Sequence, residues 1–328
     1  MTDPQTPSFG GAAIVQRPPA TVDVSVLVPA RDEAESLAQF IEQCDVVFRT
    51  CAERYEVIVI DDGSRDNTWS VLEGLRAQYP FVRTVRHRSG RGIADALRSG
   101  YLTSDAGILV FYPADLQFKP EDIPRLVAPI LAGESDMVTG RKEGKYDKAF
   151  VSRIYNGLSR TLFQIPVQDL NNVKAYRREV MDDQPVRPDW HRYMIVLAVA
   201  QGYSVSEIPV PLYPRNAGKS KFGLSRIPIG VLDMLAVWFE LRFGRKPLLA
   251  FGILGGAMFA IAGIIGLLLL TTRAGTRPYW TMIQSALTLG SVFFATGILG
   301  EQIAALRAEQ RELRRRLDER ASDSSSDA

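Results

Sequence analysis

The stretch Ala106-Gly107-Ile108-Leu109-Val110-Phe111-Tyr112, followed directly by Pro113-Ala114-Asp115-Leu116-Gln117-Phe118, decides the fold. Its first half is an unbroken apolar run, which is typical of a strand buried on both faces of a parallel sheet. The next residues, Lys119-Pro120-Glu121-Asp122, carry the proline and acids of a helix start. Asp115 and Gln117 therefore stand where a buried strand ends and a helix begins. In open α/β sheets that edge binds ligands, although a polar turn without chemistry fits the octapeptide Phe111–Phe118 equally well.

Strand and helix signals alternate along the chain before this stretch. Runs rich in β-branched residues predict strands, and amphipathic runs that follow capping residues predict helices between them. This alternation predicts a mostly parallel, doubly wound α/β sheet of the Rossmann-like kind. The expected strands cover residues 22–28, 56–60, 82–86, 106–112, 137–138, 173–176 and 205–210, and the expected helices cover 33–50, 68–78, 92–100, 151–163 and a segment after His191.

Composition excludes several classes of protein. The formal net charge is +2 over 328 residues, so the chain has no global basic field and we expect no nucleic-acid partner. The two cysteines, Cys44 and Cys51, fall on one helical stripe of apolar residues. That spacing indicates buried, reduced packing residues and argues against a metal or redox pair. With two histidines in all, the chain does not favour a histidine-based zinc site.

Two uncharged runs near the C-terminus, residues 248–270 and 279–300, each exceed the ~20 residues needed to cross a bilayer. Two such runs in tandem favour membrane spans over buried core helices. Lysine and arginine residues flank the outer ends of the pair, so the positive-inside tendency predicts a hairpin with both ends in the cytosol. We therefore expect an integral protein of the cytoplasmic membrane whose soluble domain faces the cytoplasm.

The segments beside the hairpin carry further patterns. Residues 227–243 are apolar around most of the helix circumference, which suits a helix lying in the membrane interface or packing on the soluble domain. After the second span, Ile303, Leu306, Leu313 and Leu317 keep coiled-coil spacing, so this helix either supports a homo-oligomer or is solvated. The expected organisation is a disordered arm over 1–20, a cytosolic α/β domain over 21–225, an interfacial amphipathic helix over 226–246, a transmembrane hairpin over 247–300, and a cytosolic helix with a disordered tail over 301–328.

Polar residues also follow the first two expected strands. The segment Pro29-Ala30-Arg31-Asp32-Glu33 stands where a dinucleotide-binding enzyme carries G-x-G-x-x-G, which argues against a nicotinamide or flavin dehydrogenase. Asp32 and Glu33 fit either a helix cap or a contact to a base and ribose. Asp61 and Asp62 end a buried strand, where a pair of like charges is costly unless hydrogen bonds or cations compensate.

A cluster of cations precedes the third expected helix. His87, Arg88 and Arg91 lead into Gly92 and the helix start. Clustered cations beside the free amides of a helix N-terminus predict an anion site. Asp66 lies in a loop dense in turn-forming residues and is placed to cap the second expected helix.

Taken together, these segments resemble the family 2 glycosyltransferases of the GT-A fold. The resemblance rests on Val28-Pro29-Ala30-Arg31-Asp32-Glu33, Val59-Ile60-Asp61-Asp62-Gly63-Ser64, Gly90-Arg91-Gly92-Ile93-Ala94 and Ala114-Asp115-Leu116-Gln117. The continuation is similar to the dolichyl-phosphate mannose synthase branch, which includes bacterial polyprenyl-phosphate glycosyltransferases with a C-terminal membrane hairpin. The order and spacing of the motifs make the resemblance specific over about residues 22–300. The later motifs are 139–141, Asp169, 174–179, 207–210 and 215–223.

The resemblance implies an inverting transfer of a hexose from a nucleotide sugar to a polyprenyl phosphate such as undecaprenyl or dolichyl phosphate. GDP-mannose and UDP-glucose are the donors expected by family precedent. Asp115, Asp169 and Arg141 are implied as catalytic residues. Asp115 and Gln117 are implied as ligands of Mg²⁺ or Mn²⁺, which prefer oxygen ligands and share the donor diphosphate.

The resemblance also implies how the two anionic substrates are held. Arg141, Lys148 and Ser152 match the family's contacts to the acceptor phosphate. That monoester has a second pKa of roughly 6, so it is largely dianionic at neutral pH and needs little base catalysis. Cations must offset its repulsion from the donor diphosphate, so we expect Asp169 to position the sugar and not to be an obligatory base. The implied nucleotide-sugar site consists of Pro29, Ala30, Asp32, Glu33, Asp61, Asp62, Gly63, Arg91, Asp115, Arg215 and Lys221.

Two departures from the family pattern are visible. Pro113 stands where the family carries the first acid of Asp-x-Asp-x-Gln, which removes one acidic metal ligand. The cation is then either held by more water or bound weakly. Asp169 lies in Asp169-Leu170-Asn171-Asn172-Val173, where the family commonly carries a glycine-containing segment, so the sugar-facing pocket is expected to differ.

Two other functions stay open at this point. A processive polysaccharide synthase is disfavoured because its Gln-x-x-Arg-Trp motif is absent and the chain has two expected spans. An inactive, nucleotide-sugar-binding membrane scaffold is motivated by Pro113. A transfer assay with nucleotide sugars and a lipid phosphate separates these alternatives from the leading one.

Overall fold

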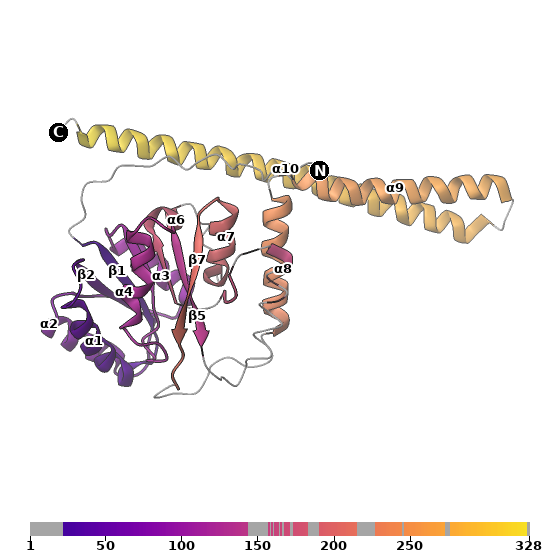
Figure 1. Cartoon of the computed structure of the whole chain (residues 1–328). Coiled ribbons are helices and arrows are strands. Elements are labelled where there is room, and N and C mark those ends of the chain that lie inside the picture. The colour runs from indigo at the N-terminus through magenta and orange to yellow at the C-terminus, as the bar shows by residue number, and fades with distance from the viewer. Residues whose placement is uncertain are drawn as a thin grey trace, which may run out of the picture. The chain divides into compact units, whose positions relative to one another are not determined.

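The computed structural model describes residues 22–143, 157–182 except 158, 160, 164, 166, 171 and 172, 190–214, 227–244, 246–272 and 276–326 (Figure 1). The chain forms two compact units, the first ending at Ile227 and the second beginning at Pro228. The first unit contains a β-sheet with helices on its faces. The described part of the second unit is helical.

The strands in the described part of the first unit form one sheet. They are β1 (Val24–Ala30), β2 (Tyr55–Asp61), β3 (Val82–Arg86), β4 (Ile108–Phe111), β5 (Met137–Glu143), β6 (Lys174–Arg177) and β7 (Val205–Pro211). Their order is β3-β2-β1-β4-β6-β5-β7. β1 pairs in parallel with β2 and β4, β2 with β3, and β5 with β7. β6 runs antiparallel to both β4 and β5, so the expected mostly parallel sheet is confirmed with one reversed strand.

Helices cover both faces of this sheet (Figure 1). They are α1 (Ala34–Phe48), α2 (Thr68–Gln78), α3 (Ile93–Thr103), α4 (Asp122–Leu131), α6 (Arg178–Asp182), η1 (Trp190–Tyr193) and α7 (Met194–Ala200). Phe40 of α1 belongs to the same apolar core as Val26 of β1. On the other face, a Cβ added to Gly100 of α3 would lie 3.0 Å from the side chain of Leu27. Because successive strand residues point to opposite faces, α1 and α3 sandwich the sheet.

The apolar runs of the sequence explain the core. Every residue of β2 is buried, and in β1 only Pro29 is partly exposed, as expected for strands covered on both faces. The apolar run 106–112 contains β4, and Ala106 and Tyr112 at the ends of the run are also buried. Cys44 is buried in the core, as expected, whereas Cys51 is only partly buried and packs against that core.

The second unit consists of α8 (Ile227–Phe243), α9 (Pro247–Thr272) and α10 (Thr276–Ser326). α9 and α10 contain two stretches long and apolar enough to cross a membrane. Their large apolar side chains lie on the surface, with Leu270 82% exposed, so these are not the core helices of a soluble domain. The two helices approach closely at glycines, because a Cβ on Gly255 would lie 2.9 Å from the carbonyl oxygen of Gly290.

Two polar contacts connect α10 to the other two helices, α8 and α9. Glu301 of α10 accepts a hydrogen bond from the Leu248 backbone N–H at 3.3 Å, in the first turn of α9, where a carboxylate suits the helix dipole. Arg307 of α10 pairs with Glu240 of α8 at 3.2 Å. Each helix of the second unit is therefore bound to α10 through a charged side chain.

Candidate active site

The carboxyl edge of the sheet collects the polar residues singled out in the sequence. The strand order reverses at β1, which lies between β2 and β4, and such a switch point is where open α/β sheets bind ligands. The segments that end or follow β1, β2 and β4 carry Asp32, Asp61 and Asp115. The antiparallel β6 begins at this same edge, because Lys174 pairs with Phe111, the last residue of β4.

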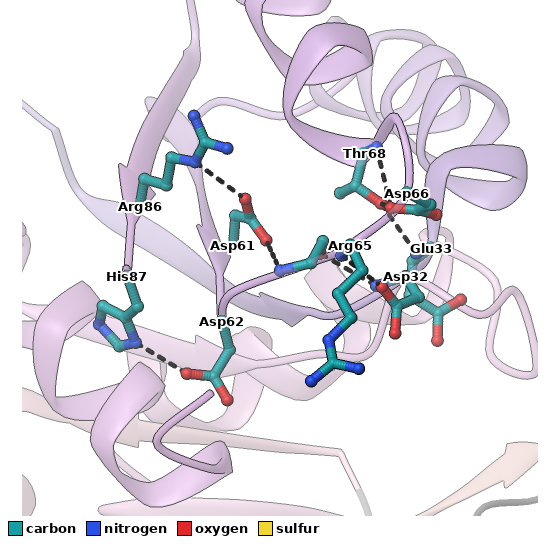
Figure 2. Close-up of polar contacts among 10 residues, drawn as sticks. Asp32, Glu33, Asp61, Asp62, Arg65, Asp66, Thr68, Arg86 and His87 are labelled. Atoms are coloured by element: carbon teal, nitrogen blue, oxygen red, sulfur yellow. Dashed lines mark hydrogen bonds and ion pairs between the residues drawn. The ribbon is translucent and has the colours of Figure 1, made fainter. Parts of the chain in front are cut away.

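The loops after β1 and β2 are bound to each other (Figure 2). The backbone N–H of Asp32 donates to Ser64 Oγ at 3.0 Å, and the N–H of Arg65 donates to the Asp32 carboxylate at 2.8 Å. The N–H of Glu33 donates to Thr68 Oγ1 at 3.1 Å. Glu33 is the N-cap residue of α1, but its side chain makes no hydrogen bond that caps the helix. Both acids instead shape a loop at the switch point.

Asp61 and Asp62 have separate sets of partners, as the cost of two buried like charges requires (Figure 2). Asp61 Oδ1 accepts a hydrogen bond from the Ser64 N–H at 2.9 Å, and Asp61 Oδ2 lies 3.6 Å from Arg86 Nε. No described residue donates a hydrogen bond to Asp61 Oδ2, which is buried. A buried acceptor of this kind at a ligand-binding edge suits a donor group on a ligand.

Asp62 joins the end of β2 to the start of α3. Its carboxylate accepts hydrogen bonds from the backbone N–H groups of Arg91 and Gly92, both at 2.8 Å, and contacts His87 Nδ1 at 2.8 Å. Burial raises the pKa of Asp62, but the hydrogen bonds from Arg91, His87 and Gly92 outweigh it and hold that pKa below its usual value. His87 Nε2 lies 2.9 Å from Ser99 Oγ. Within the protein, the anion bound by His87 and by the start of α3 is the carboxylate of Asp62.

Gly63 permits the closest approach in this region. Its φ is +69°, and an added Cβ would lie 2.6 Å from the backbone nitrogen of Gly90. Only glycine fits where a left-handed backbone meets another backbone so closely. The Gly63 turn and the Gly90–Gly92 segment therefore pack directly against each other at the carboxyl edge of the sheet.

The loop after β4 is held by alternate side chains. Ala114, Leu116 and Phe118 are buried in the core, while Asp115 and Gln117 alternate with them. Leu116 has a φ of +57°, a left-handed conformation that costs a leucine roughly 1–2 kcal/mol. Strained residues of this kind persist when packing determines them, and Leu116 is only 6% exposed. The core therefore fixes the bend between the two residues predicted to bind metal.

The donor set at this bend fits a hard divalent cation. Asp115 supplies a carboxylate, which also accepts the Gln117 N–H at 3.2 Å, and Gln117 supplies an amide oxygen. Among the described residues there is no group of three His, Cys, Asp or Glu side chains that could hold a metal. Two protein oxygens completed by water and a diphosphate suit Mg²⁺ or Mn²⁺ and do not suit zinc.

A second cluster lies on the other side of β4. The backbone N–H groups of Gln168 and Asp169 donate to Glu207 Oε1 of β7 at 2.9 and 3.0 Å, and the Asp169 carboxylate lies 3.6 Å from Lys142 Nζ. Lys174 is fully buried beside them, and burial lowers its pKa to about 7 against the attraction of Asp169. Sequence reasoning missed Lys174 and Lys142, because a lysine in a strand is most often a surface residue.

Of the remaining residues predicted for the site, the structure describes only Arg141. Arg141 lies at the end of β5 at this edge, half exposed, with a guanidinium nitrogen 3.4 Å from Glu143. Lys148, Ser152, Arg215 and Lys221 lie outside the described residues. The described site is therefore an acidic edge of the sheet at the switch point, with the buried Lys174 and the partly buried Lys142 on one side.

A sheet of this order, with acidic residues at its carboxyl edge, is that of a GT-A-type domain. The fold is that of glucosyl-3-phosphoglycerate synthase from Mycobacterium tuberculosis, solved with Mg²⁺ and uridine diphosphate, with a TM-score of 0.55. That chain is 19% identical, and the match covers 67% of this chain and 79% of that one, so the likeness shows the fold alone.

Sequence relatives identify the family. A family model described as glycosyl transferase family 2 matches residues 25–184. Dodecaprenyl-phosphate galacturonate synthase of Rhizobium johnstonii is 30% identical over 307 residues, covering 88% of this chain and 89% of that one. Undecaprenyl-phosphate 4-deoxy-4-formamido-L-arabinose transferase of Klebsiella pneumoniae is 27% identical over 300 residues, which cover 88% of this chain and 90% of that one. The chain therefore belongs to glycosyltransferase family 2 and is a glycosyltransferase.

Proposed function

We propose that this glycosyltransferase moves a sugar from a nucleotide sugar to a polyprenyl phosphate at the cytoplasmic face of the membrane. One observation carries the proposal. Similarity to two enzymes named for polyprenyl-phosphate acceptors extends over 88% of the chain, further than the soluble unit alone could account for. An acceptor embedded in a bilayer matches a chain that adds two bilayer-length helices to a GT-A domain.

The donor would bind across the switch point. Asp32, Asp61 and Asp62 would line the nucleoside pocket together with Pro29, Ala30, Glu33, Gly63 and Arg91, since the loops that carry most of them are joined by hydrogen bonds. GDP-mannose and UDP-glucose stay predictions from the resemblance. The two relatives named above transfer different sugars, so the donor must be found by experiment.

Asp115 and Gln117 would hold Mg²⁺ or Mn²⁺ against the donor diphosphate. Solved enzymes of this fold contain Mg²⁺ or Mn²⁺ together with uridine diphosphate, which supports a divalent ion here. The ion would supply positive charge to the diphosphate as it leaves. Arg215 and Lys221 would add cations to the same group by the family resemblance.

The acceptor phosphate would attack the anomeric carbon directly, with inversion. Arg141, Lys148 and Ser152 would bind that phosphate and reduce its repulsion from the diphosphate. The Asp169 carboxylate already lies within ion-pair distance of Lys142 Nζ, at 3.6 Å. We therefore assign Asp169 to the orientation of the sugar, with the nucleophile supplied by the ionised phosphate itself.

A transfer assay tests this function. Purified full-length protein in detergent is incubated with undecaprenyl phosphate, Mg²⁺ or Mn²⁺, and labelled GDP-mannose, UDP-glucose, UDP-galacturonate or UDP-4-deoxy-4-formamido-L-arabinose. A lipid-linked sugar is the expected product with one donor. Donor binding without lipid product from any of them would overturn the proposal and leave a nucleotide-sugar-binding scaffold.

A further inference from the structure

The first residue of β6 is a charged side chain with no exposed surface. Lys174 pairs with Phe111 of β4 on one side and with Thr139 of β5 on the other. Its Nζ atom lies 5.5 Å from the centre of the Phe111 ring. Phe111 is the last residue of β4, so the buried ammonium group lies at the carboxyl end of that strand, within electrostatic reach of Asp169.

Stability does not account for a lysine at this place. Burying an ammonium group is costly, and replacing a buried ion by an apolar residue of similar volume is often neutral or stabilising. A methionine would fill the same space between the strands with a side chain of similar length. Lys174 lies at the ligand-binding edge beside the carboxylate of Asp169, so its charge can act on that side chain.

We propose that Lys174 is a positioning residue for glycosyl transfer, which holds the Asp169 carboxylate between its own ammonium group and that of Lys142. The inference rests on the proposed function, in which Asp169 orients the sugar. Glu207 fixes the backbone of Asp169 through the two N–H groups that it accepts, and the two lysines then fix the side chain. Lys174 itself touches no substrate, because it is fully buried.

The charged groups around Lys174 determine when it can act. Asp169 favours its charged form, whereas burial and Lys142 of β5 disfavour it, so its pKa falls to about 7. On the η1 side, burial and the charges of Lys174 and Arg192 lower the pKa of His191 to about 3, so that imidazole is neutral near pH 7. The β4 neighbour is the uncharged ring of Phe111. Lys174 therefore loses its charge, and its hold on Asp169, as the pH rises through about 7.

The first test separates stability from activity. Lys174→Met should keep or raise the melting temperature of the full-length protein, while kcat with the donor that the wild type uses falls at least about tenfold and the donor KM rises by a smaller factor. If Lys174 were merely structural, its replacement would lower the melting temperature and kcat together, or would lower neither. A kcat within twofold of the wild type would overturn the inference.

The second test uses the pH profile. Wild-type kcat should rise through about pH 6, where the acceptor ionises, and fall above about pH 7 as Lys174 loses its proton. Lys174→Arg should remove the falling limb, because a guanidinium stays charged. Arg177→Lys, at the far end of β6, is the matched control and should leave the profile unchanged. A falling limb near pH 7 that persists in Lys174→Arg would contradict the assignment.

A third measurement distinguishes failure of this inference from failure of the proposed function. If the wild type makes no lipid-linked product, the proposed function fails. The role of Lys174 is then tested by nucleotide-sugar binding alone. The probes are then UDP against UDP-glucose and GDP against GDP-mannose, in thermal shift assays at pH 6. The extra stabilisation that the sugar adds should shrink in Lys174→Met, and an unchanged increment would overturn the inference.

Discussion

The carboxylate of Asp62 accepts a hydrogen bond from the backbone N–H of Gly92 at 2.8 Å, 30 residues further along the chain. This bond joins the end of β2 to the start of α3, and the N–H of Arg91 and the ring of His87 bind the same carboxylate. A helix start rich in cations thus surrounds an acidic side chain of its own protein. This wall of the proposed donor site, formed by Asp62, His87 and the start of α3, is therefore in place before any donor binds.

Replacement of His87 by phenylalanine tests this wall. His87→Phe keeps the ring but removes the contacts to Asp62 and Ser99, leaving a buried carboxylate with fewer partners. Such a loss costs about 1–3 kcal/mol, which should lower the melting temperature by roughly 3–10 °C. Thermal unfolding in detergent measures it. Ser99→Ala, which removes only the outer contact, should have a smaller effect, and equal effects would contradict the role of Asp62.

Replacement of Gly63 by alanine tests the close approach. Gly63→Ala places a Cβ 2.6 Å from the Gly90 nitrogen at a φ of +69°, so the two loops must separate. Donor affinity should fall at least about tenfold in a binding titration, because the loops carry the nucleoside pocket. Gly74→Ala is the matched control. Gly74 lies inside α2 with no atom near its Cβ position, so the same change should stabilise by up to about 1 kcal/mol without altering affinity.

Replacement of Asp115 tests the metal assignment. Asp115→Asn keeps the shape of the side chain but removes its charge, so cation and diphosphate lose an electrostatic partner. Transfer should fall about 100-fold or more, and chelation by EDTA should abolish wild-type transfer until Mg²⁺ or Mn²⁺ is restored. A spectroscopic titration with Mn²⁺ reports binding independently. Near-normal transfer by Asp115→Asn would remove this residue from the metal site.

Cysteine labelling tests the orientation of the chain in the membrane. With Cys51 replaced by serine, Cys44 is the remaining native thiol, and burial raises its pKa so far that it stays unreactive. Single cysteines at Ser70 and Glu309 should react with an impermeant maleimide only after the cells are permeabilised, since both lie on the expected cytoplasmic side. Arg277→Cys, between the spans, should react in intact cells. Labelling of the Ser70 variant in intact cells would contradict the predicted orientation and place this domain outside the cytoplasm.

Local patterns predicted the elements well where the periodicity was strong. The expected helices 68–78 and 227–243 and the strand 82–86 coincide with α2, α8 and β3, and both expected spans lie inside α9 and α10. Asp66 accepts the N–H of Thr68, as expected for a cap of α2. The place of β6 could not be predicted in this way. Its strand signal was visible, but its insertion between β4 and β5 is decided by contacts far apart in the chain.

In the candidate site too, features set by local sequence could be predicted, whereas contacts between distant residues could not. The acids at the ends of β1, β2 and β4 could be predicted, because strands of a parallel sheet end at one edge and their sequence shows where they end. The partners of His87 and Lys174 could not. His87 stands beside arginines in the sequence, yet its partner Asp62 comes from the neighbouring strand, 25 residues away. The sequence around Lys174 shows its charge, whereas its burial follows from the strands on either side.

Leu116 has a further consequence. Its side chain is held in the apolar core while its backbone keeps a left-handed bend between Asp115 and Gln117. The hydrophobic effect therefore maintains the shape of this loop in the empty enzyme, and the donor need not lose affinity by ordering it. Leu116 lies in the core and binds no ligand. Its replacement by a β-branched residue would nevertheless change the affinity of this transferase for its cation.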